Sequence, residues 1–315
     1  MTTPAAEHLF CAGHTACAGC GQAVAARLVI DIAGKNTMIA NNTGCLEVFS
    51  TKYPESSWGV PWIHSLFENA AAVASGIEAA LKHLGTKDKI NVICQAGDGG
   101  TADIGLQALS GMWERGHDIL SICYDNEAYM NTGVQRSGLT PFETSTSTTP
   151  IGSQSAGNPR PKKPMPEIAV AHGLAYVATA SVGYLRDIEN KVKKAISIKG
   201  PKYLQIHVPC PLGWRHESQL TYDIAKLAVE TGLYPLIEYE NGKLTNARKL
   251  AKIKPVEEYL KCQGRFKHII NSPELVKQIQ AVADKNIERY GLKAEQGVPQ
   301  PPKAVHAQPK VYPAS

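Results

Sequence analysis

The sequence of 315 residues contains no uninterrupted apolar stretch of the roughly 20 residues that a membrane-spanning helix needs. Its first residues also lack the charged region followed by an apolar core that marks a secretory signal. From these absences we expect a cytoplasmic protein with no membrane partner. In that compartment the eight cysteines serve as thiols or metal ligands rather than as disulfides.

Long basic runs are missing as well, although the net charge is +5. The densest basic spot, residues 160–163, lies in a proline-rich stretch. A nucleic-acid-binding face would interleave basic and aromatic side chains, and none is visible, so we predict no nucleic-acid partner. The mild basicity suits a solvated surface or a docking face for an acidic electron carrier.

One part of the chain predicts a βαβ unit. Residues 90–94 form an apolar run typical of a strand, residues 101–115 can form a helix, and residues 118–124 form a second apolar run. Two strands joined by a helix pair in parallel, with a right-handed crossover. The apolar helical positions expected to face inward are Ile104, Leu106, Ala108, Leu109 and Met112.

Polar groups follow both strands of this unit. Gly97, Asp98, Gly99 and Gly100 come directly after the first strand, and Asn126 follows the second. The glycines let the backbone approach a ligand, and the N–H groups of the next helix favour a phosphate. A carboxylate and an amide oxygen, completed by diphosphate oxygens, suit Mg²⁺. Alone, Gly-Asp-Gly is more often a simple turn, so the spacing to Asn126 carries the argument.

Four cysteines are candidate ligands. Cys17 and Cys20 form a Cys-x-x-Cys pair before a predicted helix, and Cys45 and Cys210 each follow a predicted strand. Because strand ends of a parallel sheet converge on one edge, these four thiols could meet. Their spacing leaves a [4Fe–4S] cluster, a structural zinc ion and a thioredoxin-like pair open.

The remaining cysteines have no such placement. Cys94 and Cys123 lie within apolar strand runs and are expected to be buried small hydrophobic residues. Cys11 and Cys262 are not expected to be ligands, although Cys11 is close in sequence to the Cys-x-x-Cys pair.

The loop after the second strand is specific enough to name a family. The glycine turn with Asn126 resembles the diphosphate domain of thiamine diphosphate (ThDP) enzymes. Residues 124–137, YDNEAYMNTGVQRS, resemble the β subunit of the 2-oxoacid:ferredoxin oxidoreductases, pyruvate-type branch. The resemblance covers roughly residues 8–240.

This resemblance implies a set of site residues. Mg²⁺ would be held by Asp98, Asn126 and the backbone carbonyl of Ala128. Asn131 would face the thiazolium ring and the substrate, with Thr132 beside it at the cofactor. A [4Fe–4S] cluster next to ThDP would be held by the four residues Cys17, Cys20, Cys45 and Cys210. The implied reaction is the oxidative decarboxylation of a 2-oxoacid, with electrons passing through the cluster to ferredoxin.

The family also implies partners. An α subunit would supply the carboxylate that activates ThDP, for which no motif is apparent here, so this chain alone should be inactive. A γ subunit that helps to handle CoA, and a ferredoxin-like chain or domain, would complete the assembly.

The sequence leaves both the substrate and the reaction class open. Glu143 and Thr144 stand where pyruvate enzymes typically carry Gly-Ala, and Gln22 stands where they often carry Glu. Pyruvate is therefore the default substrate and oxalate an alternative. A non-redox ThDP lyase or decarboxylase with a Cys₄ zinc site, and a structural subunit with a vestigial ThDP site, are the competing interpretations.

The rest of the chain predicts one α/β domain in residues 1–215, a parallel sheet with helices on both faces, and a C-terminal extension in residues 216–315. His64 and Glu68 are interpreted as a hydrogen-bonded pair in a turn that enters a helix, and Asn241-Gly242 as a hairpin turn. Residues 137–166 lack any period and are expected to wrap over the active site or a partner. Residues 1–10 and 297–315 are expected to be extended arms. Further helices are predicted at 22–32, 70–84, 166–172, 184–198, 218–230, 255–261 and 273–290, and strands at 37–40, 174–179 and 203–208.

Overall fold

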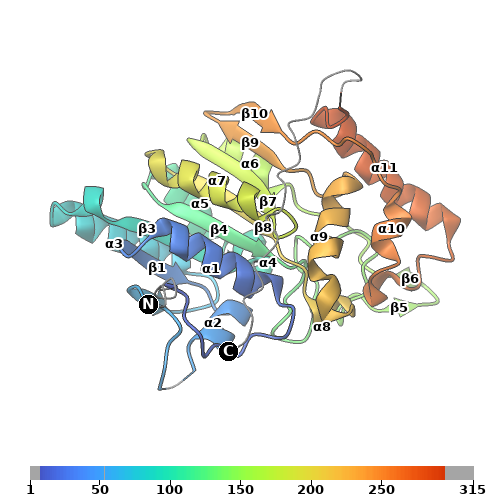
Figure 1. Ribbon diagram of the computed structural model, residues 1–315, viewed down its shortest axis with the longest axis horizontal. Coiled ribbons are helices and arrows are strands. Elements are labelled where there is room, and N and C mark those ends of the chain that lie inside the picture. The colour runs from blue at the N-terminus through green and yellow to red at the C-terminus, as the bar shows by residue number, and fades with distance from the viewer. Residues whose placement is uncertain (1–7, 53, 295–315) are drawn as a thin grey trace, which may run out of the picture.

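A single mixed sheet organises the chain in the computed structural model, which describes residues 8–52 and 54–294 (Figure 1). The strand order is β10-β9-β7-β8-β4-β3-β1-β2, with the six strands from β7 to β2 parallel and the β9–β10 hairpin antiparallel at one edge. The strands are β1 (Thr37–Asn41), β2 (Trp62–His64), β3 (Asn91–Gly97), β4 (Leu120–Asp125), β7 (Tyr176–Ser181), β8 (Lys202–His207), β9 (Ile237–Glu240) and β10 (Lys243–Ala247). The predicted α/β class is confirmed.

Helices cover both faces of this sheet, as predicted. Helices α1 and α7 pack on one face, and α3, α5 and α6 pack on the other. The helices are α1 (Gly21–Ala33), α2 (Cys45–Ser50), α3 (Ala70–His83), α4 (Asp98–Ala102), α5 (Leu106–Glu114), α6 (Met165–Ala171), α7 (Leu185–Ser197), α8 (Pro211–Trp214), α9 (Thr221–Glu230), α10 (Val256–Leu260) and α11 (Pro273–Arg289).

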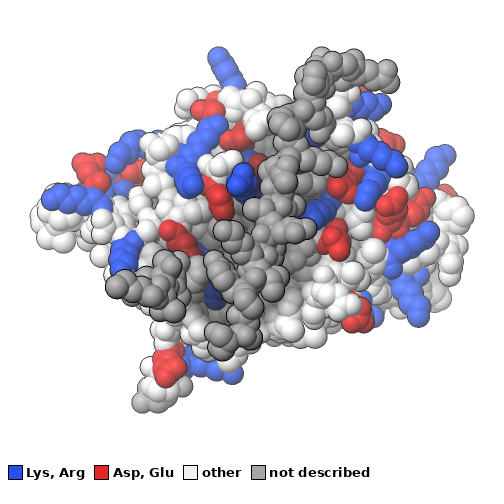
Figure 2. Space-filling model, in the orientation of Figure 1, with Lys and Arg blue, Asp and Glu red and all other residues white. Residues whose placement is uncertain are grey.

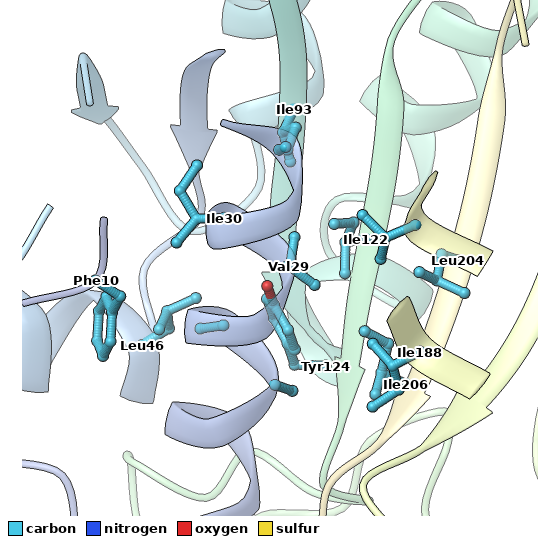
Figure 3. Packing of buried hydrophobic residues seen from close by; sticks show 14 of the residues in the cluster. Phe10, Val29, Ile30, Leu46, Ile93, Ile122, Tyr124, Ile188, Leu204 and Ile206 are labelled. Atoms are coloured by element: carbon cyan, nitrogen blue, oxygen red, sulfur yellow. The ribbon is translucent and has the colours of Figure 1, made fainter. Parts of the chain in front are cut away.

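The strand sequences explain why both faces are covered. Neighbouring residues of a strand point to opposite faces, so Ile122 packs under α1 and α7 while Cys123 packs under the helices of the other face. Figure 3 shows Val29 of α1 and Ile188 of α7 over Ile122 and the neighbouring strand β8. Such continuous apolar strands are typical of parallel sheets buried on both sides.

A third apolar cluster lies in the C-terminal part. It joins Ile224 of α9, Val256 of α10 and Ile279 of α11 to Trp214. The hairpin turn is the predicted one, since Asn241 and Gly242 have φ values of 47° and 79° and link β9 to β10. The C-terminal part therefore has its own core and also extends the main sheet, while the domain boundary near residue 215 stays a prediction.

The single helix predicted for residues 101–115 is wrong. Helix α4 ends at Ala102, and α5 begins at Leu106. A Cβ atom at Gly105 would lie 2.0 Å from the carbonyl oxygen of Gly100, so the chain turns tightly there. Ile104, expected to face inward, is instead 53% exposed.

Two further predictions change in the region before α3. Residues 62–64 form the edge strand β2, where we predicted a loop that enters a helix. His64 Nε2 lies 2.7 Å from the Thr43 hydroxyl, and no hydrogen bond to Glu68 is found among the described residues, so the predicted pair is wrong. Residues 137–166 are mostly irregular as expected, but contain the small hairpin of β5 (Ile151–Gly152) and β6 (Ser155–Ala156).

None of the helices in the described ranges is long and apolar enough to cross a membrane. On the face drawn in Figure 2, basic and acidic side chains are intermixed over the described residues. The two arms predicted at the ends lie largely outside the described residues.

Candidate active site

A pocket opens at the carboxyl edge of β3 and β4, where parallel sheets bind ligands. Every residue predicted to hold Mg²⁺ or ThDP lines it, together with Cys45 and Gln22. These predicted residues are Gly97, Asp98, Gly99, Gly100, Asn126, Ala128, Asn131 and Thr132. Asn131 and Thr132 stand at its exposed rim, and the glycine turn forms its buried floor.

The three predicted ligand groups converge within this pocket. With its amide oriented to satisfy its neighbours, Asn126 donates to the Asp98 carboxylate at 2.7 Å and to the Ala128 carbonyl oxygen at 2.8 Å. Two of the groups are oxygens of the hard type that Mg²⁺ prefers, and rotation of the Asn126 amide would present a third. The donor set therefore fits the ion.

The charge of Asp98 also favours a bound cation. Its side chain is 1% exposed, and it makes no ion pair with any residue in the described ranges. Burial and the neighbouring Asp125 carboxylate raise the pKa of Asp98 well above its ordinary value, and the Ser137 hydroxyl, which donates to it, opposes them only in part. A buried carboxylate without a counterion is costly, and a bound cation would compensate it.

The loop that carries Asn126 is held by buried charges on its other side. Lys162 Nζ lies 2.9 Å from Asp125 Oδ2 and 2.7 Å from Glu127 Oε1, and Arg265 Nη2 lies 2.6 Å from Glu127 Oε2. Burial would raise the pKa of Glu127, but the two cations outweigh it and lower that pKa to about 2. Glu127 has a φ of 68°, a left-handed conformation that surrounding contacts must maintain.

Sequence reasoning missed these cations. A signal was available, since Asp125 and Glu127 flank Asn126 directly and would need partners once buried. Lys162 comes from residues 137–166, as does Ser137, so this segment packs against the back of the site. None of its residues lines the pocket, so the prediction that it wraps over the active site or a partner stays a prediction. Arg265 comes from the C-terminal part, which no local pattern connects to this loop.

The four candidate cysteines are brought close to one another. Besides burial, the nearby Cys17 and Cys210 raise the pKa of the Cys20 thiol, to about 11. Burial and the other three cysteines raise the pKa of Cys45 to about 12, and Asp98 contributes to that shift. Cys45 therefore lies between the cysteine group and the Asp98 edge of the pocket.

A single metal ion would require these thiols to stand close together. Zinc–sulfur bonds are about 2.3 Å long, so sulfurs on one zinc ion stand within about 4 Å of one another. Over the described ranges, no group of three or more His, Cys, Asp or Glu side chains is close enough to hold one metal ion. As placed in the structure, the described thiols are therefore not spaced as the ligands of one ion.

Local structure fixes each of the four thiols. Cys45 is the first residue of α2, and Cys210 caps α8, its sulfur accepting the Gly213 N–H at 3.4 Å. In the Cys17–Cys20 turn, Gly19 has a φ of 74°, and a Cβ atom there would lie 2.4 Å from the Ser218 carbonyl oxygen. That turn therefore requires glycine.

The other cysteines stand apart, as predicted. Cys94 and Cys123 are buried in β3 and β4. Cys11 donates to the His8 carbonyl oxygen at 3.3 Å, and Cys262 to the Glu258 carbonyl oxygen at 3.2 Å.

Comparison with known proteins gives the family. Residues 33–206 match the thiamine pyrophosphate enzyme, C-terminal TPP binding domain. The chain is 57% identical to pyruvate synthase subunit PorB of Methanosarcina barkeri, over 93% of this chain and 100% of that protein. It is 50% identical to ketoisovalerate oxidoreductase subunit VorB of Pyrococcus abyssi, over 85% and 88%.

A solved structure shows the same fold. The 2-oxoglutarate:ferredoxin oxidoreductase of Magnetococcus marinus matches with a TM-score of 0.54 at 22% identity, over 68% of this chain and 77% of that chain. Taken with the sequence matches, the chain belongs to the ThDP-dependent 2-oxoacid:ferredoxin oxidoreductases, as a β subunit of the pyruvate type.

Proposed function

We propose that this chain binds ThDP through Mg²⁺ held by Asp98, Asn126 and the Ala128 carbonyl, and that Cys17, Cys20, Cys45 and Cys210 hold a [4Fe–4S] cluster beside it. The observation that carries the metal site is the buried Asp98 carboxylate without an ion-pair partner in the described residues, with the Asn126 amide bonded both to it and to the Ala128 carbonyl oxygen. When bound, ThDP supplies the electron sink for decarboxylation of a 2-oxoacid.

The chain's own residues would prepare the site for this chemistry. Gly97, where a Cβ atom would meet nothing within 4 Å, would leave room for the diphosphate beside Gly99 and Gly100, and Asn131 at the rim would orient the substrate. Cys45, at the wall of the same pocket, places one cluster ligand next to the reacting centre. Electrons from the substrate would therefore leave toward the cysteine side, and on to ferredoxin.

Pyruvate is the proposed substrate. The PorB relatives named for pyruvate synthase support it, while the VorB relative of similar identity shows that a β subunit of this kind also serves a branched 2-oxoacid. Of the residues that suggested oxalate, Gln22 lines the pocket, and its side-chain oxygen has no partner in the described part of the chain. Glu143 and Thr144 do not line the pocket, which weakens the case for oxalate.

Partner subunits follow from the incomplete site. An α subunit would bring the activating carboxylate over the pocket, and a γ subunit and a ferredoxin-like chain would handle CoA and electrons. Exposed apolar side chains near the pocket support such docking. Val48 lies in the helix that begins at Cys45, and Leu212 lies in the helix capped by Cys210. Leu66 is also exposed, and its carbonyl oxygen accepts the N–H of Thr43, which lines the pocket. A reducing cytoplasm would suit a thiolate-held cluster.

The test is to assay the assembled enzyme for iron, acid-labile sulfide, ThDP and viologen reduction. Pyruvate, 2-oxoisovalerate, 2-oxoglutarate and oxalate would be compared with and without CoA. We expect about four iron atoms per cluster and fastest reduction with pyruvate. A colourless, zinc-containing protein that decarboxylates without reducing viologen would support the non-redox lyase instead, and a protein that retains no ThDP would support a vestigial site.

A further inference from the structure

Helix α8 connects the cysteine side of the site to the loop that carries Asn126. It follows Cys210 directly, and Cys210 caps it through the Gly213 N–H. The last residue of α8, Trp214, is fully buried, and its Nε1–H donates to the backbone carbonyl of Asn126 at 2.8 Å. Four residues after the proposed cluster ligand Cys210, the chain is thus bonded to the proposed magnesium ligand Asn126, 88 positions earlier.

Arg265 reinforces this contact. Its guanidinium lies 3.6 Å from the centre of the Trp214 ring, and its Nη2 pairs with Glu127, the residue after Asn126. Arg265 is 1% exposed and is itself held by Gln263 at 2.9 Å and the Tyr259 hydroxyl at 3.2 Å. A buried cation stacked on an aromatic ring and paired with a carboxylate fixes both partners.

Close backbone packing gives a third connection. A Cβ atom at Gly213 would lie 2.1 Å from Met130 Sδ and 3.5 Å from Cys210 Sγ. Helix α8 therefore sits directly against the residue before Asn131. No side chain other than hydrogen would fit at Gly213 unless Met130 moved.

We propose that Trp214 and Arg265 are positioning residues that lock the Cys210 turn and the loop of Asn126 into one rigid unit. The inference rests on the proposed function, because it assigns Cys210 to the cluster and Asn126 to Mg²⁺. Neither side chain lines the cofactor pocket, so both act through the groups that they hold. Their role is to keep the ThDP site and the cluster at a constant separation.

The experiment uses Trp214→Phe in the assembled enzyme, which keeps an aromatic ring but removes the N–H donor together with the five-membered ring. The matched control is Trp113→Phe, because Trp113 is equally buried and donates at 3.1 Å to Ser121, under the helices of the opposite face. Readouts are iron content, the affinity for ThDP with Mg²⁺, and the rate of cluster reduction by pyruvate and by dithionite.

For Trp214→Phe we expect wild-type iron content, about tenfold weaker ThDP binding, and slower reduction by pyruvate with unchanged reduction by dithionite. The size follows from leaving one buried carbonyl without its hydrogen bond. Trp113→Phe should leave these readouts at wild-type values. Wild-type ThDP affinity in Trp214→Phe, or an equal loss in both variants, would overturn the proposal.

Arg265→Lys provides a second test if Trp214→Phe fails to assemble. It keeps the charge beside Glu127 but not the planar stacking on Trp214. We expect the same weakening of ThDP binding at wild-type iron content, and wild-type binding would overturn the proposal. A wild-type enzyme that binds no ThDP or holds no iron would instead show that the proposed function is wrong.

Discussion

The hydroxyl of Ser137 donates a hydrogen bond to the carboxylate of Asp98, 39 positions earlier in the chain, and both side chains are buried. This contact ties the start of the irregular segment 137–166 to the glycine turn. Ser137 stands behind the proposed metal site and orients the carboxylate proposed as a ligand. Mutation of a side chain that hydrogen-bonds to a metal ligand typically lowers metal affinity about 10- to 100-fold. We therefore expect Ser137→Ala to weaken Mg²⁺-dependent ThDP binding by about tenfold, measured by calorimetry on the assembled enzyme.

Replacing Asp98 by Asn should stabilise the metal-free chain. The pKa of Asp98 is raised by folding, so its stabilising protonated form is lost as pH rises through that pKa, and the ionised group destabilises the fold at neutral pH. Asp98→Asn should gain on the order of 1 kcal/mol in unfolding free energy at pH 7. It should also abolish the further stabilisation that Mg²⁺ with ThDP gives the wild type.

Thermal unfolding with and without the cofactors measures both effects. Asp88→Asn is a control, because Asp88 is exposed and lies far from the pocket-lining residues. A metal-free Asp98→Asn variant less stable than the wild type would contradict the account of this carboxylate.

The buried ion pairs of Glu127 predict a specific response to acid. Because Lys162 and Arg265 lower the pKa of Glu127 from 4.5 to about 2, their stabilisation is complete above about pH 4.5 and is lost as pH falls toward 2. Glu127→Gln should reduce the unfolding free energy by about 3 kcal/mol at pH 7. That difference from the wild type should shrink between pH 4.5 and 2 in chemical denaturation, and a difference independent of pH would count against it.

Two glycines of the predicted cofactor turn should differ in their response to alanine. A Cβ atom at Gly99 would lie 2.3 Å from the Tyr129 ring, whereas at Gly97 it would meet nothing within 4 Å. Gly99→Ala should therefore cost about 1–3 kcal/mol of unfolding free energy in the cofactor-free chain, the usual cost of overpacking. Gly97→Ala should change it by less than about 0.5 kcal/mol. Equal losses would show that the turn, rather than the Tyr129 contact, sets the requirement for glycine.

Much of this architecture could be predicted because the decisive signals are local. Apolar runs identified β3 and β4, and Asp98 and Asn126 follow them directly, so one edge of the sheet had to collect both. The break between α4 and α5 was not predictable, because it depends on Gly105 meeting Gly100 and on Asp103 accepting the Gly138 N–H at 2.8 Å. Strand β2 was missed because three residues after a proline give no period to read.

The cations behind the loop that carries Asn126 could not be predicted for a related reason. Lys162 reaches Glu127 across 35 positions and Arg265 across 138, and neither belongs to a motif. Only the folded chain places them on the same carboxylate. The sequence predicted which residues hold the cofactor, but not which residues hold those residues in place.

The cysteine assignment predicts a clear difference between two serine variants. Cys45→Ser should lose the iron of this chain's cluster, about four atoms per copy in the assembled enzyme, because a cubane needs its four thiolates. Cys262→Ser should keep it, since that thiol bonds only to the Glu258 carbonyl oxygen. Iron and acid-labile sulfide analysis measures the outcome, and full iron content in Cys45→Ser would remove Cys45 from the ligand set.

The most direct test of the account is the electron paramagnetic resonance spectrum of the assembled enzyme, frozen under anaerobic conditions after mixing with pyruvate. We predict the signal of a reduced [4Fe–4S] cluster that requires ThDP and Mg²⁺ and is absent from Cys45→Ser. Release of CO₂ from pyruvate by an enzyme whose spectrum shows no reduced cluster would contradict it.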